Sequence, residues 1–180
     1  MTQKRSAPTT CSSRACNPVA QEIELESAQE LKPADVLEFL AQQCDTDLVG
    51  RWSGDPFLRT PGMEIRAYRV APKGRELKEK AQRHAAKIGF RPKISVTFGI
   101  RKLASLPERD AAWEMMLHLV IAFAQRYPAE AVLLFEGAEV LMRCRDGEIV
   151  FDASEYFEED LNLAAIVSQH QQETLDQPYM

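Results

Sequence analysis

Three nearly consecutive stretches of sequence decide the fold: ISVTFGIR at 94–101, AAWEMMLHLVIAFAQRYP at 111–128, and AVLLFEGAEVLMRCRDGEIVFD at 131–152. In the first stretch, apolar residues alternate with small, polar or basic ones. Side chains of a β-strand point to opposite faces in turn, so this period of two predicts a half-buried strand.

The second stretch predicts a helix over 109–127 that is apolar on nearly every side. Only Glu114, His118 and Gln125 form a polar strip along it. A helix with so little polar surface belongs in the core of a protein, with other elements packed around it. We therefore expect a central helix here.

The third stretch predicts a β-meander. Its last turn, Asp146-Gly147, is the residue pair preferred in a two-residue hairpin loop. A loop of two residues determines the pairing of the two strands. The predicted cross-strand pairs are Arg145 with Glu148, Cys144 with Ile149, and Met142 with Phe151.

The remaining segments complete an α+β architecture, in which a mostly antiparallel sheet ends in the meander and two to three further helices pack on it beside the central one. We expect strands at 19–26 and 63–70, helices from Pro33, at 73–89 and at 154–174, and an irregular segment at 49–62. Residues 1–18 are rich in Ser, Thr, Pro and Arg and predict a disordered leader. A single domain is expected over 19–176.

Composition excludes several classes of protein. The chain has 180 residues, of which 45% are hydrophobic and 27% charged, an ordinary mixture for a globular protein. No stretch approaches the roughly 20 apolar residues of a spanning helix, and no apolar segment follows the basic N-terminus as in a secretion signal. We therefore expect a cytoplasmic protein, no contact with a membrane and reduced cysteines. The four cysteines and three histidines lack ligand-like spacing, so we expect no metal and no cofactor.

Charge is distributed unevenly along the chain. Residues 69–93 carry nine Lys and Arg against two Glu, whereas residues 111–180 carry 13 acidic and three basic side chains. The basic segment keeps open a nucleic-acid-associated or regulatory function. A sequence pI near 5.3 and the absence of interleaved aromatic residues argue against a dedicated nucleic-acid-binding protein.

Catalytic signatures are not found. There is no Gly-rich phosphate-binding loop, no G-x-S-x-G turn and no H-E-x-x-H helix. Glu114 and His118, one helical turn apart, could act as orienter and base, but no nucleophile accompanies them. A structural polar strip is the better interpretation. His84, in a Lys- and Arg-rich helix, is expected to be solvated.

The second half of the chain resembles the immunity proteins of myxobacterial swarming-inhibition toxins and their uncharacterised bacterial relatives. The resemblance covers about residues 88–152 and lies in Gly89–Pro92, Ser95–Phe98, Met116-Leu117, Pro128–Phe135, Gly137 and Asp146-Gly147. Relatives commonly have Asn at the position of Glu136, where a turn requires positive φ. The resemblance implies a protein without catalytic residues, which binds and blocks a cognate toxin encoded by a neighbouring gene.

One acidic segment is a candidate for contact with such a toxin. It combines five carboxylates with two aromatic residues: Asp152, Glu155, Tyr156, Phe157, Glu158, Glu159 and Asp160. The charges would accelerate encounter with a basic toxin and the aromatic rings would supply buried contact. The alternative is a helix N-terminus whose acidic residues favour the helix dipole and whose aromatic residues face the core.

Overall fold

The computed structural model describes residues 19–46, 48–52, 55–153, 157 and 161–178, so the predicted leader at 1–18 lies outside the described residues. The described elements, in chain order, are β1 (Val19–Ser27), α1 (Pro33–Gln43), β2 (Leu48–Trp52), β3 (Asp55–Arg59), β4 (Met63–Arg69), α2 (Arg75–Ile88), β5 (Ile94–Arg101), α3 (Leu106–Arg126), β6 (Ala131–Phe135), β7 (Glu139–Arg145), β8 (Glu148–Asp152), α4 (Leu161–Val167) and β9 (Gln171–Glu173).

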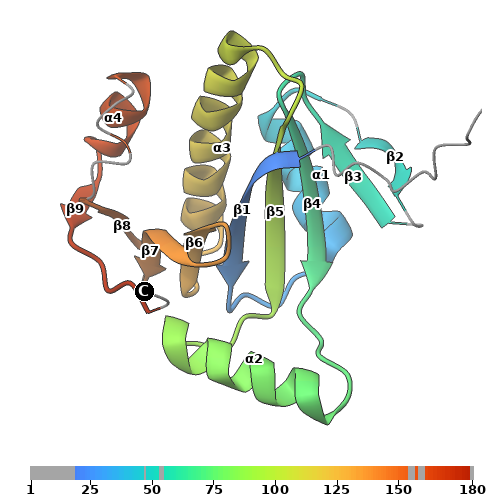
Figure 1. Cartoon of the computed structure of the whole chain (residues 1–180), viewed down its shortest axis with the longest axis vertical. Helices are drawn as coiled ribbons and strands as arrows, with labels where there is room; N and C mark the ends of the chain where they lie inside the picture. Colours follow the sequence, from blue (N-terminus) through green and yellow to red (C-terminus); the bar gives the residue numbers. More distant parts are fainter. Residues whose placement is uncertain (1–18, 47, 53–54, 154–156, 158–160, 179–180) are drawn as a thin grey trace, which may run out of the picture.

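The strands form one sheet in the order β2-β3-β4-β5-β1-β6-β7-β8-β9 (Figure 1). Every neighbouring pair is antiparallel except β8 and β9. This confirms the predicted α+β class and its mostly antiparallel sheet.

The predicted hairpin register is confirmed as well. In the β7–β8 pair, Arg145 faces Glu148, Cys144 faces Ile149 and Met142 faces Phe151. Asp146 and Gly147 have φ of 53° and 81°, as a type I′ turn requires. The preceding turn places Glu136 at φ 49°, in the region where Asn is the more favourable residue.

One face of the sheet carries the main core. α1 packs against β3 and β4, α3 packs against β5, and α4 packs against α3. Ile23 and Leu25 of β1 point toward these helices and belong to the same cluster as Met116 and Val120 of α3. Nine side chains of α3 are buried, which confirms the predicted central helix.

The other face of the sheet carries α2. Successive residues of a strand point to opposite faces, so Glu26, next to the core residue Leu25, points away from α3. His84 of α2 contacts Glu26 from that side. A second, smaller apolar cluster lies on this face and combines the end of α2 with β6 and β7: Ile88, Phe90, Val132, Leu134 and Val140, with Ala28 and Leu175 packed against them.

The prediction of an irregular segment at 49–62 is wrong, because β2 and β3 occupy most of it. β3 pairs with β4 only at Leu58 and Arg59, and Pro56 lies where β3 pairs with β2 alone. Proline is tolerated where a strand leaves one side of its backbone unpaired. Backbone pairing of β3 with β2 and β4 therefore outweighs the glycine and proline residues, which by themselves predict a loop.

The prediction of one helix over 154–174 is wrong at its end. α4 stops at Val167, and residues 171–173 form β9, which runs parallel to β8. All three β9 side chains are exposed. Because backbone hydrogen bonds rather than buried side chains hold this strand, its sequence has no hydrophobic period to detect.

Burial differs from expectation in two other elements. β5 is more buried than a half-buried strand: on its second face Ser95, which is 1% exposed, and Gly99 are buried, while Thr97 and Arg101 are half-buried. α2 buries little of its apolar surface: Leu77 is 55% exposed and only Ile88 is buried.

Candidate functional site

The structure describes two residues of the acidic segment, and both are buried. Asp152 is 5% exposed, and its Oδ1 accepts a hydrogen bond of 2.7 Å from the backbone N–H of Leu175. Phe157 is 3% exposed and packs edge-to-face on Phe151, with 5.8 Å between ring centroids. Both side chains stabilise the end of the sheet.

The other five residues of that segment lie outside the described residues: Glu155, Tyr156, Glu158, Glu159 and Asp160. Their part in partner binding stays a prediction. The burial of Phe157 agrees with the alternative interpretation, in which aromatic residues of this segment face the core.

Glu114 of the Glu114–His118 pair has a hydrogen-bond partner in another helix. His118 is exposed, and Glu114 accepts a 2.6 Å hydrogen bond from the side-chain amide of Asn162 in α4. Glu114 therefore contributes to the contact between α3 and α4, as expected of a structural polar strip.

A charged cluster that sequence reasoning did not find lies where α2 crosses β1. His84 Nε2 is 2.5 Å from Glu26 Oε2, and Glu26 is only 8% exposed. The prediction that His84 is solvated is therefore wrong. Burial raises the pKa of the neighbouring Glu24 carboxyl above its usual 4.5, and the Glu26 and Glu22 carboxylates raise it further.

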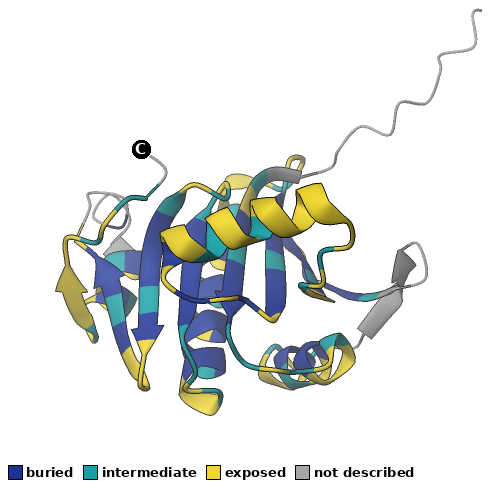
Figure 2. Cartoon of the chain, turned by 90° about the horizontal axis from the view of Figure 1, so that it is seen from below, coloured by how far each residue is buried: buried dark blue, intermediate teal, exposed yellow. Residues whose placement is uncertain are grey.

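The contact between His84 and Glu26 holds α2 against the sheet. The helix is exposed along most of its length (Figure 2), so a polar contact in its middle adds to the anchor that Ile88 supplies at its end. Arg143 of β7 adds a third contact, since its guanidinium donates a 2.9 Å hydrogen bond to the Ile88 carbonyl. No sequence pattern signals the contact between Glu26 and His84, which are 58 residues apart.

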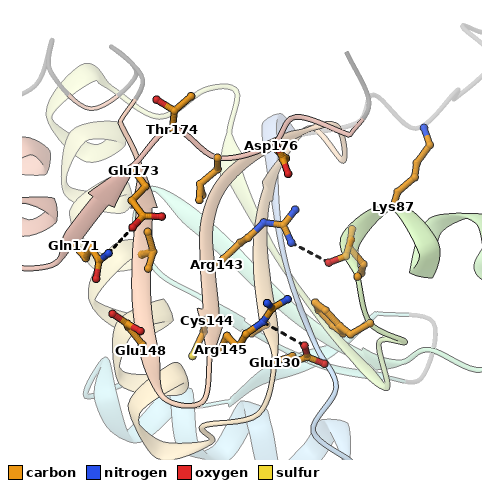
Figure 3. Close-up of a pocket in the computed structure, with 16 residues that line it drawn as sticks. Lys87, Glu130, Arg143, Cys144, Arg145, Glu148, Gln171, Glu173, Thr174 and Asp176 are labelled. Carbon is orange, nitrogen blue, oxygen red and sulfur yellow. Dashed lines mark hydrogen bonds and ion pairs between the residues drawn. The ribbon is translucent and has the colours of Figure 1, made fainter.

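A pocket of about 570 Å³ lies between the end of α2, the β7–β8 hairpin and the C-terminal segment (Figure 3). Its charged residues have both signs: Lys87, Glu130, Arg143, Arg145, Glu148, Glu173 and Asp176. Several of these groups already have partners within the protein. Arg143 donates to Ile88, and Arg145 Nε lies 3.6 Å from Glu130 Oε1. These internal contacts favour a structural role for the charged residues of this pocket.

A second pocket, of about 340 Å³, is dominated by one sign of charge. Four cations from the segments on either side of α2 line it together with one carboxylate: Arg69, Lys73, Arg91, Lys93 and Glu30. The first two cations precede α2 and the other two follow it. Folding α2 over the sheet therefore gathers the two ends of the predicted basic segment into one site.

Two other features concern the part of the chain that the structure describes. Within it, no three His, Cys, Asp or Glu side chains are grouped as metal ligands would be. No helix among the described residues has the length and apolar character needed to cross a bilayer.

A family model described as SitI3-like matches residues 21–160, well over half of the chain. The chain belongs to the SitI3-like family. No curated protein and no solved structure matches it significantly.

The family assignment confirms the resemblance drawn from the sequence and widens its range. The SitI3-like pattern begins at residue 21, inside β1, whereas the resemblance covered only the segment from α2 to β8. β1 pairs with both β5 and β6 at the middle of the sheet. The family pattern thus includes the strand that joins the two halves of this SitI3-like fold.

Proposed function

We propose that this SitI3-like protein is an immunity protein, which neutralises a cognate bacterial toxin by direct protein–protein contact. The observation that carries the proposal is the family match over residues 21–160. In this proposal the protein acts in the cytoplasm of the producing bacterium, during competition between swarming cells. It uses no cofactor and performs no catalysis.

The distribution of charge supports a binding function. α2 and its flanking loops present exposed cations, whereas the C-terminal third of the chain is strongly acidic. Opposed fields of this kind accelerate encounter with a partner of complementary charge. The proposed contact surface in the acidic segment rests on Glu155, Tyr156, Glu158, Glu159 and Asp160, since Asp152 and Phe157 are buried.

The test is a protection assay followed by purification of the complex. The product of the neighbouring gene is expressed in a bacterial host with and without this protein, and growth is followed. We expect growth arrest without it, rescue with it, and a stoichiometric complex recovered at low salt. Reversing the charge of Glu155, Glu158, Glu159 and Asp160 together tests whether the acidic segment contributes.

The outcomes separate two functions. Failure to rescue growth and to bind the neighbouring gene product would contradict the immunity function. Recovery of nucleic acid with the purified protein, sensitive to nuclease and to 0.5 M salt, would favour the nucleic-acid-associated function that the basic segment keeps open.

A further inference from the structure

The least buried helix of the structure is also its most basic element. All nine cations of the segment 69–93 are exposed: Arg69, Lys73, Arg75, Lys78, Lys80, Arg83, Lys87, Arg91 and Lys93. Residues 73–80 form an unbroken exposed run. A helix that buries only Ile88 contributes little to the core, so stability alone does not account for its position.

The cations that line the 340 Å³ pocket are available for a ligand. Within the described part of the chain, no ion pair joins Arg69, Lys73, Arg91 or Lys93 to a carboxylate, although Glu30 lines the same pocket. Elsewhere, exposed arginines do pair, as Arg75 does with Glu79 at 2.8 Å. The pocket therefore concentrates positive charge that the fold does not neutralise through ion pairs.

The position of this charge is held by the fold. A backbone hydrogen bond of 2.9 Å, from Val70 N–H to the Lys93 carbonyl, joins the loop before α2 to the loop after it. Lys93 N–H also donates to Ser27 of β1 at 2.8 Å. The contact of His84 with Glu26 and the burial of Ile88 attach the second half of α2 to the sheet.

We propose that α2 and the pocket at its base form a docking surface for an acidic region of a partner protein. The proposal rests on the immunity function for the identity of that partner, the cognate toxin. Carboxylates of the toxin would enter the pocket between Lys73 and Arg91. Leu77, 55% exposed among the cations of α2, would supply apolar contact.

A folded acidic protein fits this surface better than a nucleic acid does. Single-stranded nucleic acids are held by aromatic platforms as well as cations, and the single aromatic residue of the segment 69–93, Phe90, is buried. Carboxylates also interrupt the surface: Glu76 and Glu79 are exposed on α2, and Glu30 lines the pocket. A continuous phosphate backbone would meet these charges, whereas a partner with a compact acidic patch can avoid them.

The experiment uses two variants of the full chain with equal change in net charge. K73E/R91E reverses two pocket cations, and K102E/R126E reverses one Lys and one Arg outside the pocket. Each variant takes the formal charge from −5 to −9. All four side chains are at least partly exposed, so circular dichroism and the urea midpoint should stay close to those of the parent protein.

Affinity for the neighbouring gene product is measured at 50 mM and 300 mM NaCl. We expect K73E/R91E to lose at least tenfold in affinity at low salt, and K102E/R126E to stay within twofold of the parent. Equal losses in both variants, or none in K73E/R91E, would overturn the docking surface while leaving the immunity function intact.

A second measurement decides the question even if the neighbouring gene product does not bind. The ¹⁵N-labelled protein is titrated with a ten-residue glutamate peptide, and separately with a ten-nucleotide single-stranded DNA of similar charge. We expect peptide-induced shifts centred on residues 69–73 and 91–93, abolished by K73E/R91E. Shifts spread evenly over all exposed cations, no binding at millimolar peptide, or tighter binding of the oligonucleotide would each overturn the proposal.

Discussion

Replacing Gly62 by alanine should destabilise the protein through a clash with the backbone of α3. Gly62 lies in the turn between β3 and β4, where its carbonyl accepts a 2.9 Å hydrogen bond from Arg101 N–H. A Cβ atom at this position would lie 2.9 Å from the Ala112 Cβ and closer still to the carbonyl oxygen of Glu108. Carbon atoms in contact are normally about 3.5–4.0 Å apart.

The cost can be worked from this geometry. The Glu108 carbonyl oxygen is the closer atom, so the turn and α3 must separate by roughly 1 Å to restore ordinary contact distances. Overpacking of a buried site costs about 1–3 kcal/mol, and a helix carbonyl cannot rotate away as a side chain can. We therefore expect a loss of about 3 kcal/mol, which corresponds to a fall in Tm of roughly 6–12 °C for a chain of this size.

Urea unfolding measures this loss. It can be followed by the fluorescence of Trp113, which is 8% exposed, and by circular dichroism. The control is Gly137→Asn, because Gly137 has φ 69° but a Cβ there meets nothing within 4 Å. Asparagine tolerates positive φ, so the control should cost less than about 1 kcal/mol. A loss below about 1 kcal/mol in Gly62→Ala would refute the close approach of the turn to α3.

Three further predictions concern the core, the carboxylate cluster and α2. Phe98→Ala should cost about 3–5 kcal/mol of unfolding free energy because Phe98 is fully buried, whereas Leu77→Ala should cost less than about 0.5 kcal/mol, both by urea unfolding. Glu24 has a raised pKa in the folded state, so it binds a proton more readily there than in the unfolded chain. Ionisation of Glu24 therefore lowers the free energy of unfolding as pH rises above about 4.5. Glu24→Gln should raise the urea midpoint by more at pH 7 than at pH 4. A larger increase at pH 4 would contradict the raised pKa of Glu24. His84→Ala removes the 2.5 Å contact with Glu26 and should accelerate amide exchange in α2 by several-fold while leaving α3 unchanged; equal acceleration in both helices would indicate global destabilisation instead.

The elements that sequence predicted well are those in which side chains face a core. The alternation at 94–101 and the apolar helix at 109–127 correspond to β5 and α3, and the Asp146-Gly147 turn produced the observed register. In each case the buried positions carry apolar residues, so the spacing of apolar residues along the sequence indicates the type of element. The same reasoning paired Cys144 with Ile149, and both residues are buried.

The elements that sequence predicted poorly are held by backbone pairing. β3 contains a proline and β9 contains three exposed polar residues, yet both are strands because an adjacent strand presents free backbone groups. Backbone hydrogen bonds form with any residue other than proline as donor, and they leave little trace in the sequence.

For the two candidate sites, the sequence shows which segments are charged but not how their side chains are arranged in space. The basic segment 69–93 was evident from composition, but its two ends meet in one pocket only because α2 crosses the sheet and returns to β5. The acidic segment was evident too, yet packing against Phe151 buries Phe157. Composition identifies charge, and only tertiary structure decides which charges converge.

The sequence by itself determined the fold class, the central helix, the hairpin register and the membership in the SitI3-like family. These follow from short-range periodicity and turn chemistry, which act within a few residues. Tertiary structure alone decided that Glu26 meets His84 across 58 residues, that Gly62 touches α3, and that four cations share a pocket. Such contacts depend on where whole elements pack, and packing is determined by the summed burial of the chain rather than by any local pattern.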